Sequence, residues 1–118
     1  MVAAARQADA AAGLEGCDLT ALDQAERLIA RLQPQWIFQC AGATRARDPH
    51  ELYRLHVEGT LRLLGAVHRH VPGAPVVLIG SAAEYGPVPP EALPVREDYP
   101  AMPPSFFGAS KLAQTQAA

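Results

Sequence analysis

Two short apolar runs on either side of a long amphipathic stretch constrain the fold of this chain more than any other feature. The runs are residues 36–40 (WIFQC), which stop before Ala41-Gly42, and residues 76–79 (VVLI), which Gly80 follows. Short apolar runs with this punctuation predict buried strands. Between them, apolar residues recur at helical spacing over residues 49–70, and Pro72-Gly73 follows. The sequence therefore predicts one long helix between two strands.

This strand-helix-strand pattern predicts the class of the fold. Uniformly apolar strands are typical of a parallel sheet that helices cover on both faces. The crossover between the two strands is expected to be right-handed. A further short strand is expected near residues 14–17. The sequence thus predicts an α/β chain with a fragment sheet of three parallel strands.

The remaining segments carry weaker signals. Residues 3–12 are rich in alanine and favour a helix by propensity, although a frayed tail is an open alternative. Thr20, with Asp23 three residues later, matches a capping box before a helix that Pro34 ends. Seven of the eleven prolines lie in residues 87–104, which predicts a long irregular loop. Residues 105–118 favour a helix.

Composition excludes several classes of function. The 118 residues suit one domain, and a formal net charge of −2 provides no basic surface for nucleic acid. No apolar run is long enough to span a bilayer, and no leader peptide is evident, so we expect a cytoplasmic protein without a membrane partner. Cys17 and Cys40 form neither a CxxC pair nor a metal-ligand cluster. We therefore expect reduced thiols and no metal site.

Candidate site residues follow from the expected sheet, because ligands of open parallel sheets bind beyond the carboxyl ends of the strands. Three segments occupy such places: Asp18-Leu19, residues 40–44 and residues 80–86. Their small residues allow a flat ligand to approach the backbone. Ser81, at the end of a strand, is suited to hydrogen-bond a reacting oxygen.

The same segments carry a resemblance to a known family. Taken in order, Asp18-Leu19, Ala41-Gly42, and residues 57–60, 80–86 and 105–111 resemble the extended short-chain dehydrogenase/reductases, the NAD-dependent epimerases and dehydratases of nucleotide sugars. The resemblance covers about residues 16–116, and residues 81–97 look closest to the GDP-mannose 4,6-dehydratase and GDP-6-deoxy-mannose reductase branch. It implies a fragment of a Rossmann-type, doubly wound parallel sheet in a three-layer α/β/α arrangement.

The resemblance also implies a cofactor, a substrate and residue roles. The cofactor is NAD or NADP, and the partner is a nucleotide-sugar substrate, with a GDP-sugar favoured. Asp18 and Leu19 are expected at the adenine, and Cys40, Ala41 and Gly42 beside the ribose and pyrophosphate. Ser81 is expected to hydrogen-bond the reacting sugar oxygen, and Glu84 is a candidate sugar contact. Lys111 is the expected catalytic lysine, which also holds the nicotinamide ribose.

Three features depart from the family pattern. Phe107, four residues before Lys111, occupies the position of the catalytic tyrosine. A phenyl ring has no exchangeable proton, and a missing general acid or base costs on the order of 10²–10⁴ in rate. His56 stands where asparagine is usual, either as a substitute acid or base or, as we favour, as a buried or cleft-lining spectator. The sequence also lacks the glycine-rich turn that binds a pyrophosphate.

The expected function follows from both the resemblance and the departures. We expect residues 1–118 to be a partial NAD(P)-binding domain that lacks the N-terminal glycine-rich β-α-β unit and the C-terminal substrate-binding part. Hydride transfer at a sugar carbon is the expected chemistry, impaired or inactive in this chain. The alternative is a catalytically silent fragment or pseudoenzyme that acts as a binding or association module. Because a partial sheet exposes an edge, a homo-oligomer is expected.

Overall fold

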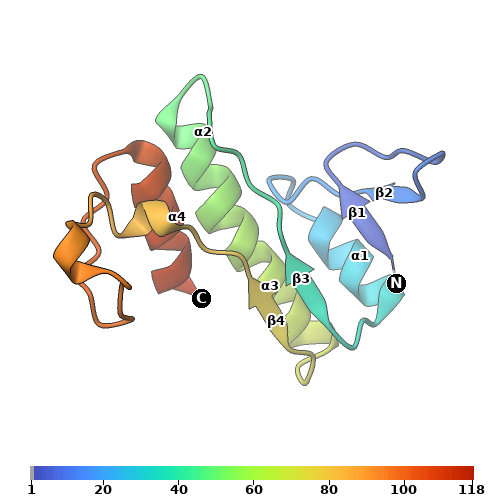
Figure 1. The fold of residues 1–118 in the computed structure, drawn as a ribbon. Coiled ribbons are helices and arrows are strands. Elements are labelled where there is room, and N and C mark those ends of the chain that lie inside the picture. Colours follow the sequence, from blue (N-terminus) through green and yellow to red (C-terminus); the bar gives the residue numbers. More distant parts are fainter. Residues whose placement is uncertain (1) are drawn as a thin grey trace.

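The computed structural model describes residues 2–118 and has an α/β fold (Figure 1). Its strands are β1 (Ala3–Ala5), β2 (Leu14–Gly16), β3 (Ile37–Gln39) and β4 (Val76–Leu78). Its helices are α1 (Gln24–Leu32), α2 (Pro49–Tyr53), α3 (Gly59–His70) and α4 (Phe106–Ala117). The parallel pairing of β3 with β4 around α3 confirms the predicted β-α-β unit.

The strands form two separate two-stranded parallel sheets. Strand β1 pairs with β2, and β3 pairs with β4. The expected sheet of three strands is therefore wrong for residues 2–118. Within this part of the chain, β1 and β3 do not pair with each other, so each keeps one backbone edge without a strand partner.

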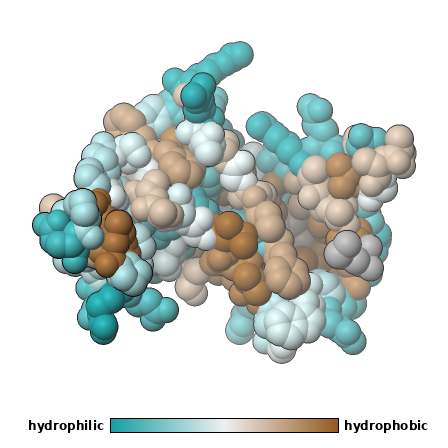
Figure 2. Space-filling view, viewed as in Figure 1, coloured by the Kyte–Doolittle hydropathy of each residue, from teal (hydrophilic) through white to brown (hydrophobic). Residues whose placement is uncertain are grey.

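The two faces of the β3–β4 pair differ in exposure. Ile37 and Val76, which are paired in the sheet, pack against the core that α1 and α3 form. On the other face, Phe38 is 65% exposed and its partner Val77 is 37% exposed. The brown surface near the centre of Figure 2 lies over these strands. Among the described residues, α1 and α3 thus pack on the Ile37 and Val76 face of this pair, and the Phe38 and Val77 face is the more exposed one.

The core lies between α1 and α3. Its buried side chains come from both helices and from the segment before α1: Leu19, Ala25, Ile29, Leu63, Ala66 and Val67. Gly59 begins α3 and allows the contact with that segment, since a Cβ on it would lie 3.0 Å from the Leu19 Cβ. Packing against Leu19 thus places the start of α3 beside the end of β2.

Two local predictions near the N-terminus are wrong. Residues 3–12 do not form a helix: residues 3–5 pair with β2, and Asp9 Oδ1 accepts hydrogen bonds from the amides of the following turn. Sheet pairing thus overrides the helix propensity of alanine. Thr20 does not cap α1, because its hydroxyl donates to Asp18 Oδ1 at 2.7 Å. The helix instead begins after Asp23, whose side chain makes no capping hydrogen bond.

The long helix predicted over residues 49–70 is present but interrupted. A π-helical segment, Arg54–Glu58, joins α2 to α3. Such segments are rare and are found frequently at functional sites. This one contains the buried His56.

Helix α4 packs closely on the 3₁₀ turn Ala82–Glu84, which follows β4. The contact depends on Gly108, because a Cβ there would lie 2.4 Å from the Ala83 carbonyl oxygen. No helix in the described part of the chain is long and apolar enough to cross a membrane.

Replacing Gly108 by alanine is expected to destabilise the fold by roughly 1–3 kcal/mol, because the new methyl group clashes with backbone that cannot give way. The matched control is Gly65→Ala in α3, where the nearest atom is the flexible Arg69 side chain at 3.4 Å. This control is expected to be neutral, or stabilising by up to about 1 kcal/mol. Urea unfolding followed by circular dichroism measures both. Equal midpoints for the two variants would contradict the packing of α4 described above.

Candidate functional site

The segments expected at the cofactor come together around the start of α3. Leu19 lies against Gly59, and Gly42 lies against His56 one turn earlier. His56 also reaches Ser110 on α4, 2.8 Å away. The segments after β2 and β3 and the helix that carries Lys111 therefore meet around the start of α3.

His56 is the centre of this junction and is fully buried. Its Nε2 accepts a hydrogen bond from the Ala43 amide at 3.2 Å, so the proton must reside on Nδ1. Nδ1 donates to Ser110 Oγ at 2.8 Å, and that hydroxyl donates to the Phe107 carbonyl oxygen at 2.8 Å. Burial, and to a lesser degree the charge of Lys111, lowers the pKa of His56. The neutral ring thus joins the loop after β3 to α4 through its two hydrogen bonds.

Lys111 joins α4 to the carboxyl end of β4. Its side chain is buried, and Nζ donates to the Ile79 carbonyl oxygen at 2.5 Å and to Gln114 Oε1. Burial lowers the pKa of Lys111, while the charge of Glu84 acts in the opposite direction. An ammonium has three donors, so one N–H remains for a ligand.

A buried amide network that the sequence analysis missed supports Lys111. Gln114 donates through Nε2 to Thr60 Oγ1 at 2.8 Å, and Gln39 lies within reach of the same hydroxyl at 3.5 Å. All three side chains are buried. The only sequence signal was the spacing of Gln114 three residues after Lys111, which places both on one face of a helix.

Ser81 ends the strand region of β4 with a hydroxyl that can still donate. Its Oγ accepts a hydrogen bond from the Ala83 amide at 3.2 Å, which leaves the hydroxyl proton available to a ligand. Glu84 completes this cap by accepting from the Ser81 amide at 2.7 Å through Oε1 and from the Thr115 hydroxyl at 2.9 Å through Oε2. Both Glu84 oxygens thus have partners within the chain, and its sugar contact stays a prediction.

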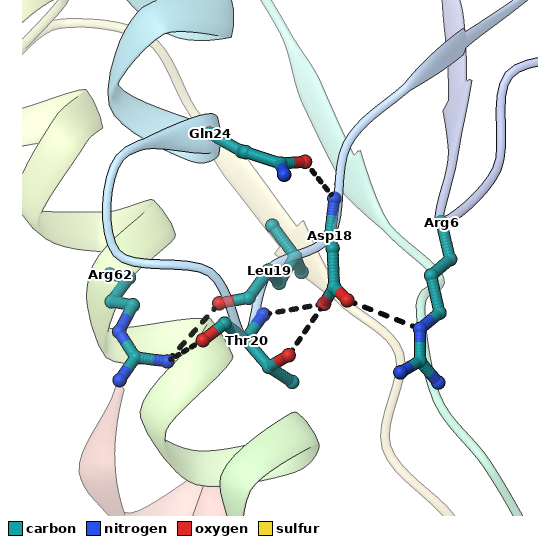
Figure 3. A network of polar contacts seen from close by, with 6 residues as sticks. All are labelled: Arg6, Asp18, Leu19, Thr20, Gln24 and Arg62. Carbon is teal, nitrogen blue, oxygen red and sulfur yellow. Dashed lines mark hydrogen bonds and ion pairs between the residues drawn. The ribbon is translucent and has the colours of Figure 1, made fainter.

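Asp18 organises the end of β2 (Figure 3). Its Oδ1 accepts from the amide and the hydroxyl of Thr20 at 2.8 and 2.7 Å, and its Oδ2 accepts from Arg6 Nε at 3.1 Å. The Thr20 hydroxyl and, less strongly, Arg6 lower the pKa of Asp18. Leu19 is buried, and its carbonyl oxygen faces Arg62 at 3.4 Å. The turn after β2 is therefore held in one conformation.

The loop after β3 offers a small, open surface. Cys40, Ala41 and Gly42 are exposed, and a Cβ on Gly42 would lie 3.3 Å from His56 Nε2. This surface, the free Ser81 proton and the remaining Lys111 N–H fit one side of a dinucleotide. Within residues 2–118 there is no glycine-rich turn for the pyrophosphate and no group of three metal-binding side chains.

Phe107 limits what this arrangement can do chemically. Its ring is half-buried and meets the His56 ring edge to face, with centroids 5.9 Å apart. The ring packs but exchanges no proton. The assembled groups can therefore hold a ligand and donate hydrogen bonds to it, whereas the position expected for proton transfer is inert.

Comparisons with known proteins agree with this geometry. Residues 2–118 match the NAD dependent epimerase/dehydratase family. A UDP-glucose 4-epimerase from Azospirillum brasilense is 43% identical over 68 residues, which is 58% of this chain and 19% of that protein. The matched segment of this chain therefore spans about a fifth of that relative's length.

Solved structures are similar over nearly the whole chain. RMD from Pseudomonas aeruginosa, complexed with NADPH, is 31% identical, with a TM-score of 0.76 over 85% of this chain and 35% of that one. A short-chain dehydrogenase/reductase superfamily protein from Agrobacterium tumefaciens with bound NAD is 26% identical, with a TM-score of 0.79 over 97% and 35%. UDP-glucose 4-epimerase from Bifidobacterium longum, with NAD+ and UDP, is 28% identical, with a TM-score of 0.72 over 87% and 31%.

The family match, over residues 2–118, includes the strand ends and α4, where the candidate site lies. They confirm the Rossmann-type α/β fold and a nicotinamide dinucleotide as the cofactor of the family. The chain belongs to the NAD dependent epimerase/dehydratase family.

Proposed function

We propose that this chain supplies one side of the cofactor and sugar site of an NAD(P)-dependent nucleotide-sugar epimerase, dehydratase or reductase. The observation that carries the proposal is the joint placement of Ser81 and Lys111 at the end of β4, where Lys111 bonds to Ile79 only two residues before Ser81. A bound dinucleotide would exchange a hydride with a sugar carbon. Ser81 would donate its free proton to the sugar oxygen, and Lys111 its remaining N–H to the nicotinamide ribose.

The other end of the cofactor would lie at the ends of β2 and β3. Asp18 and Leu19 form the fixed turn proposed at the adenine. Cys40, Ala41 and Gly42 provide the open surface proposed at the ribose and pyrophosphate. His56 would not touch the cofactor, but it sets the position of this loop through the Ala43 amide.

The pyrophosphate turn would come from a strand and a helix outside this chain, which would complete a glycine-rich β-α-β unit with β1. The support is the sheet itself, because within residues 2–118 β1 and β3 each keep an unpaired edge. The common strand order of doubly wound sheets, 3-2-1-4-5-6, places one strand between two such pairs. A strand between β1 and β3 would complete one continuous parallel sheet. We also propose a C-terminal substrate-binding part, because this chain covers only 35% of the similar structure RMD.

Proton transfer would be impaired in this chain. Phe107 stands four residues before Lys111, where the family motif has a tyrosine. His56 does not replace that tyrosine, because both of its ring nitrogens are already bonded to Ala43 and Ser110. The proposed site thus binds a dinucleotide but lacks a general acid or base.

The proposal extends to the class of the nucleotide sugar and to the oligomeric state of the chain. Residues 81–97 favour a GDP-sugar, whereas the ligand named for one similar structure is UDP. A homo-oligomer is supported by the unpaired edges of β1 and β3 and by the exposed Phe38 and Val77. A catalytically silent binding or association module is the second candidate, and the inert Phe107 ring favours it.

Phe107→Tyr tests the proposed loss of proton transfer. We expect NADP+ or NAD+ to bind the wild-type chain and the variant alike. We expect sugar-dependent reduction of the dinucleotide to rise on the order of 10²–10⁴-fold in the variant, because a general acid or base is restored. Calorimetry measures binding, and absorbance with a panel of GDP-, UDP- and dTDP-sugars measures turnover.

Phe106→Tyr is the matched control, since the neighbouring Phe106 is 66% exposed and gains the same hydroxyl outside the site. Measurable but equal turnover in the two variants would contradict the role assigned to position 107, whereas no turnover in either would assign the defect to the parts of the site proposed to lie outside this chain. Failure of the wild-type chain to bind either dinucleotide would contradict the proposed function itself.

The state of His56 predicts how stability depends on pH. Because burial lowers its pKa, the folded chain binds fewer protons than the unfolded chain below the ordinary value of 6.5. The free energy of unfolding should therefore fall as the pH decreases from about 7.5 to about 5.5.

Urea titrations across this range should show a smaller pH dependence for His56→Asn. The exposed His68 provides the control, and His68→Asn should behave like wild type. An unchanged pH dependence in His56→Asn would contradict the neutral, bonded ring.

A further inference from the structure

Lys111 differs from the arginines of this chain in its burial. It is the only lysine among the ten lysine and arginine residues of the sequence. At 6% exposure it is also the only one of these residues that is buried within residues 2–118. An arginine keeps its proton in proteins, whereas the charge of a buried lysine depends on its neighbours. The groups around Lys111 therefore decide how its charge is used.

No carboxylate forms an ion pair with Lys111 within residues 2–118. The ion pairs of this part of the chain join acidic residues to arginines and to one histidine. The charge of Glu84 acts on Lys111, but both Glu84 oxygens accept hydrogen bonds from uncharged donors, the Ser81 amide and the Thr115 hydroxyl. His56, the other titratable group that interacts with Lys111, is neutral. Lys111 is thus a buried charge without a counter-ion, whereas buried charges are ordinarily paired.

Gln114 holds Lys111 through a neutral oxygen. The Gln114 side chain is 1% exposed, and its Oε1 accepts a hydrogen bond from Lys111 Nζ. Because an ammonium has only donors, the amide must turn its oxygen towards Lys111 and its nitrogen away. Nε2 then donates to Thr60 Oγ1 at 2.8 Å and to Gln39 Oε1 at 3.4 Å. The end of β3 and the start of α3 thus fix the amide in one orientation.

Other residue types at position 114 would not serve Lys111 in the same way. An apolar side chain would leave one N–H without its acceptor, and a buried hydrogen bond that is not made is costly. A glutamate would supply the acceptor but would also compensate the charge. Of these three, only a glutamine holds the ammonium in place and leaves its charge available.

We propose that Gln114 is a positioning residue of the site: its amide oxygen fixes the Lys111 ammonium at the end of β4 and leaves the full positive charge, with one free N–H, for a bound dinucleotide. The inference rests on the proposed function, which assigns Lys111 to the nicotinamide ribose. It goes beyond that function by naming the residue that sets the position and the charge of the lysine.

Two substitutions of similar size separate position from charge. Gln114→Met removes the acceptor, whereas Gln114→Glu keeps it and adds a negative charge. The Thr60 hydroxyl can rotate to donate to the new carboxylate. Gln114→Glu therefore keeps a bonded interior and tests the inference even if Gln114→Met fails to fold. Circular dichroism establishes that each variant is folded.

The pKa of Lys111 is measured first, without a ligand. Since Lys111 is the only lysine, lysine-specific isotope labelling gives one set of side-chain NMR signals to follow against pH. We expect Gln114→Glu to raise this pKa, because an opposite charge nearby favours the protonated amine. Calorimetry then measures the binding of NAD+ and NADP+. We expect Gln114→Met to weaken binding about 10-fold, because the N–H is no longer held in place, and Gln114→Glu to weaken it through charge compensation.

The matched controls lie two residues later on the same helix. Gln116 is exposed, so Gln116→Met and Gln116→Glu make the same changes outside the buried network, and both should leave the pKa of Lys111 and the affinities close to wild type. An equal pKa of Lys111 in Gln114→Glu and Gln116→Glu, or wild-type dinucleotide affinity in Gln114→Met, would overturn the inference and leave the proposed function intact. If the wild-type chain binds neither dinucleotide, the proposed function fails, and the ligand-free pKa of Lys111 alone decides the role of Gln114.

Discussion

The site depends on the hydrogen bonds that the buried amino group of Lys111 makes. A charge in a protein interior is stable only when it is hydrogen-bonded, and Lys111 meets this need through the Ile79 carbonyl and Gln114. These bonds fix α4 on the end of β4, and the Thr115 hydroxyl adds a contact to Glu84. Once α4 is fixed, Phe107 must lie against the buried His56 ring. The position of the inert phenyl ring thus follows from how the lysine is held.

The two ends of the proposed site therefore differ in the chemical groups that they offer to a ligand. At the proposed adenine end, Asp18, Thr20 and Arg6 form a polar turn with charged groups still open to solvent. At the proposed nicotinamide end, Ser81 retains a free proton while Phe107 has none to exchange. The neutral His56 ties the loop between these ends to α4. The chain keeps groups that we propose bind a cofactor, and it has a phenylalanine at the position proposed for proton transfer.

The sequence predicted the β-α-β unit and the ends of its strands because apolar periodicity and glycine punctuation are local signals. Features set by distant contacts could not be predicted. Residues 3–5 become a strand through pairing with β2, and Thr20 bonds Asp18 in place of capping α1. The amide network around Gln114 was invisible because its partners lie 54 and 75 residues away in the chain. Likewise, the strand pattern did not reveal that one face of β3 and β4 is exposed.

Mapping of bound dinucleotide by amide chemical shifts tests the central claim most directly. On titration of the isotope-labelled chain with NADP+, we expect the largest shifts at the strand ends, in residues 18–20, 40–43 and 80–81. Small shifts are expected at residues 91–98, which lie in the proline-rich loop far from α3 in Figure 1. Shifts concentrated elsewhere, or no saturable shift at the strand ends, would contradict the assignment of this edge as the binding half of a nucleotide-sugar enzyme site.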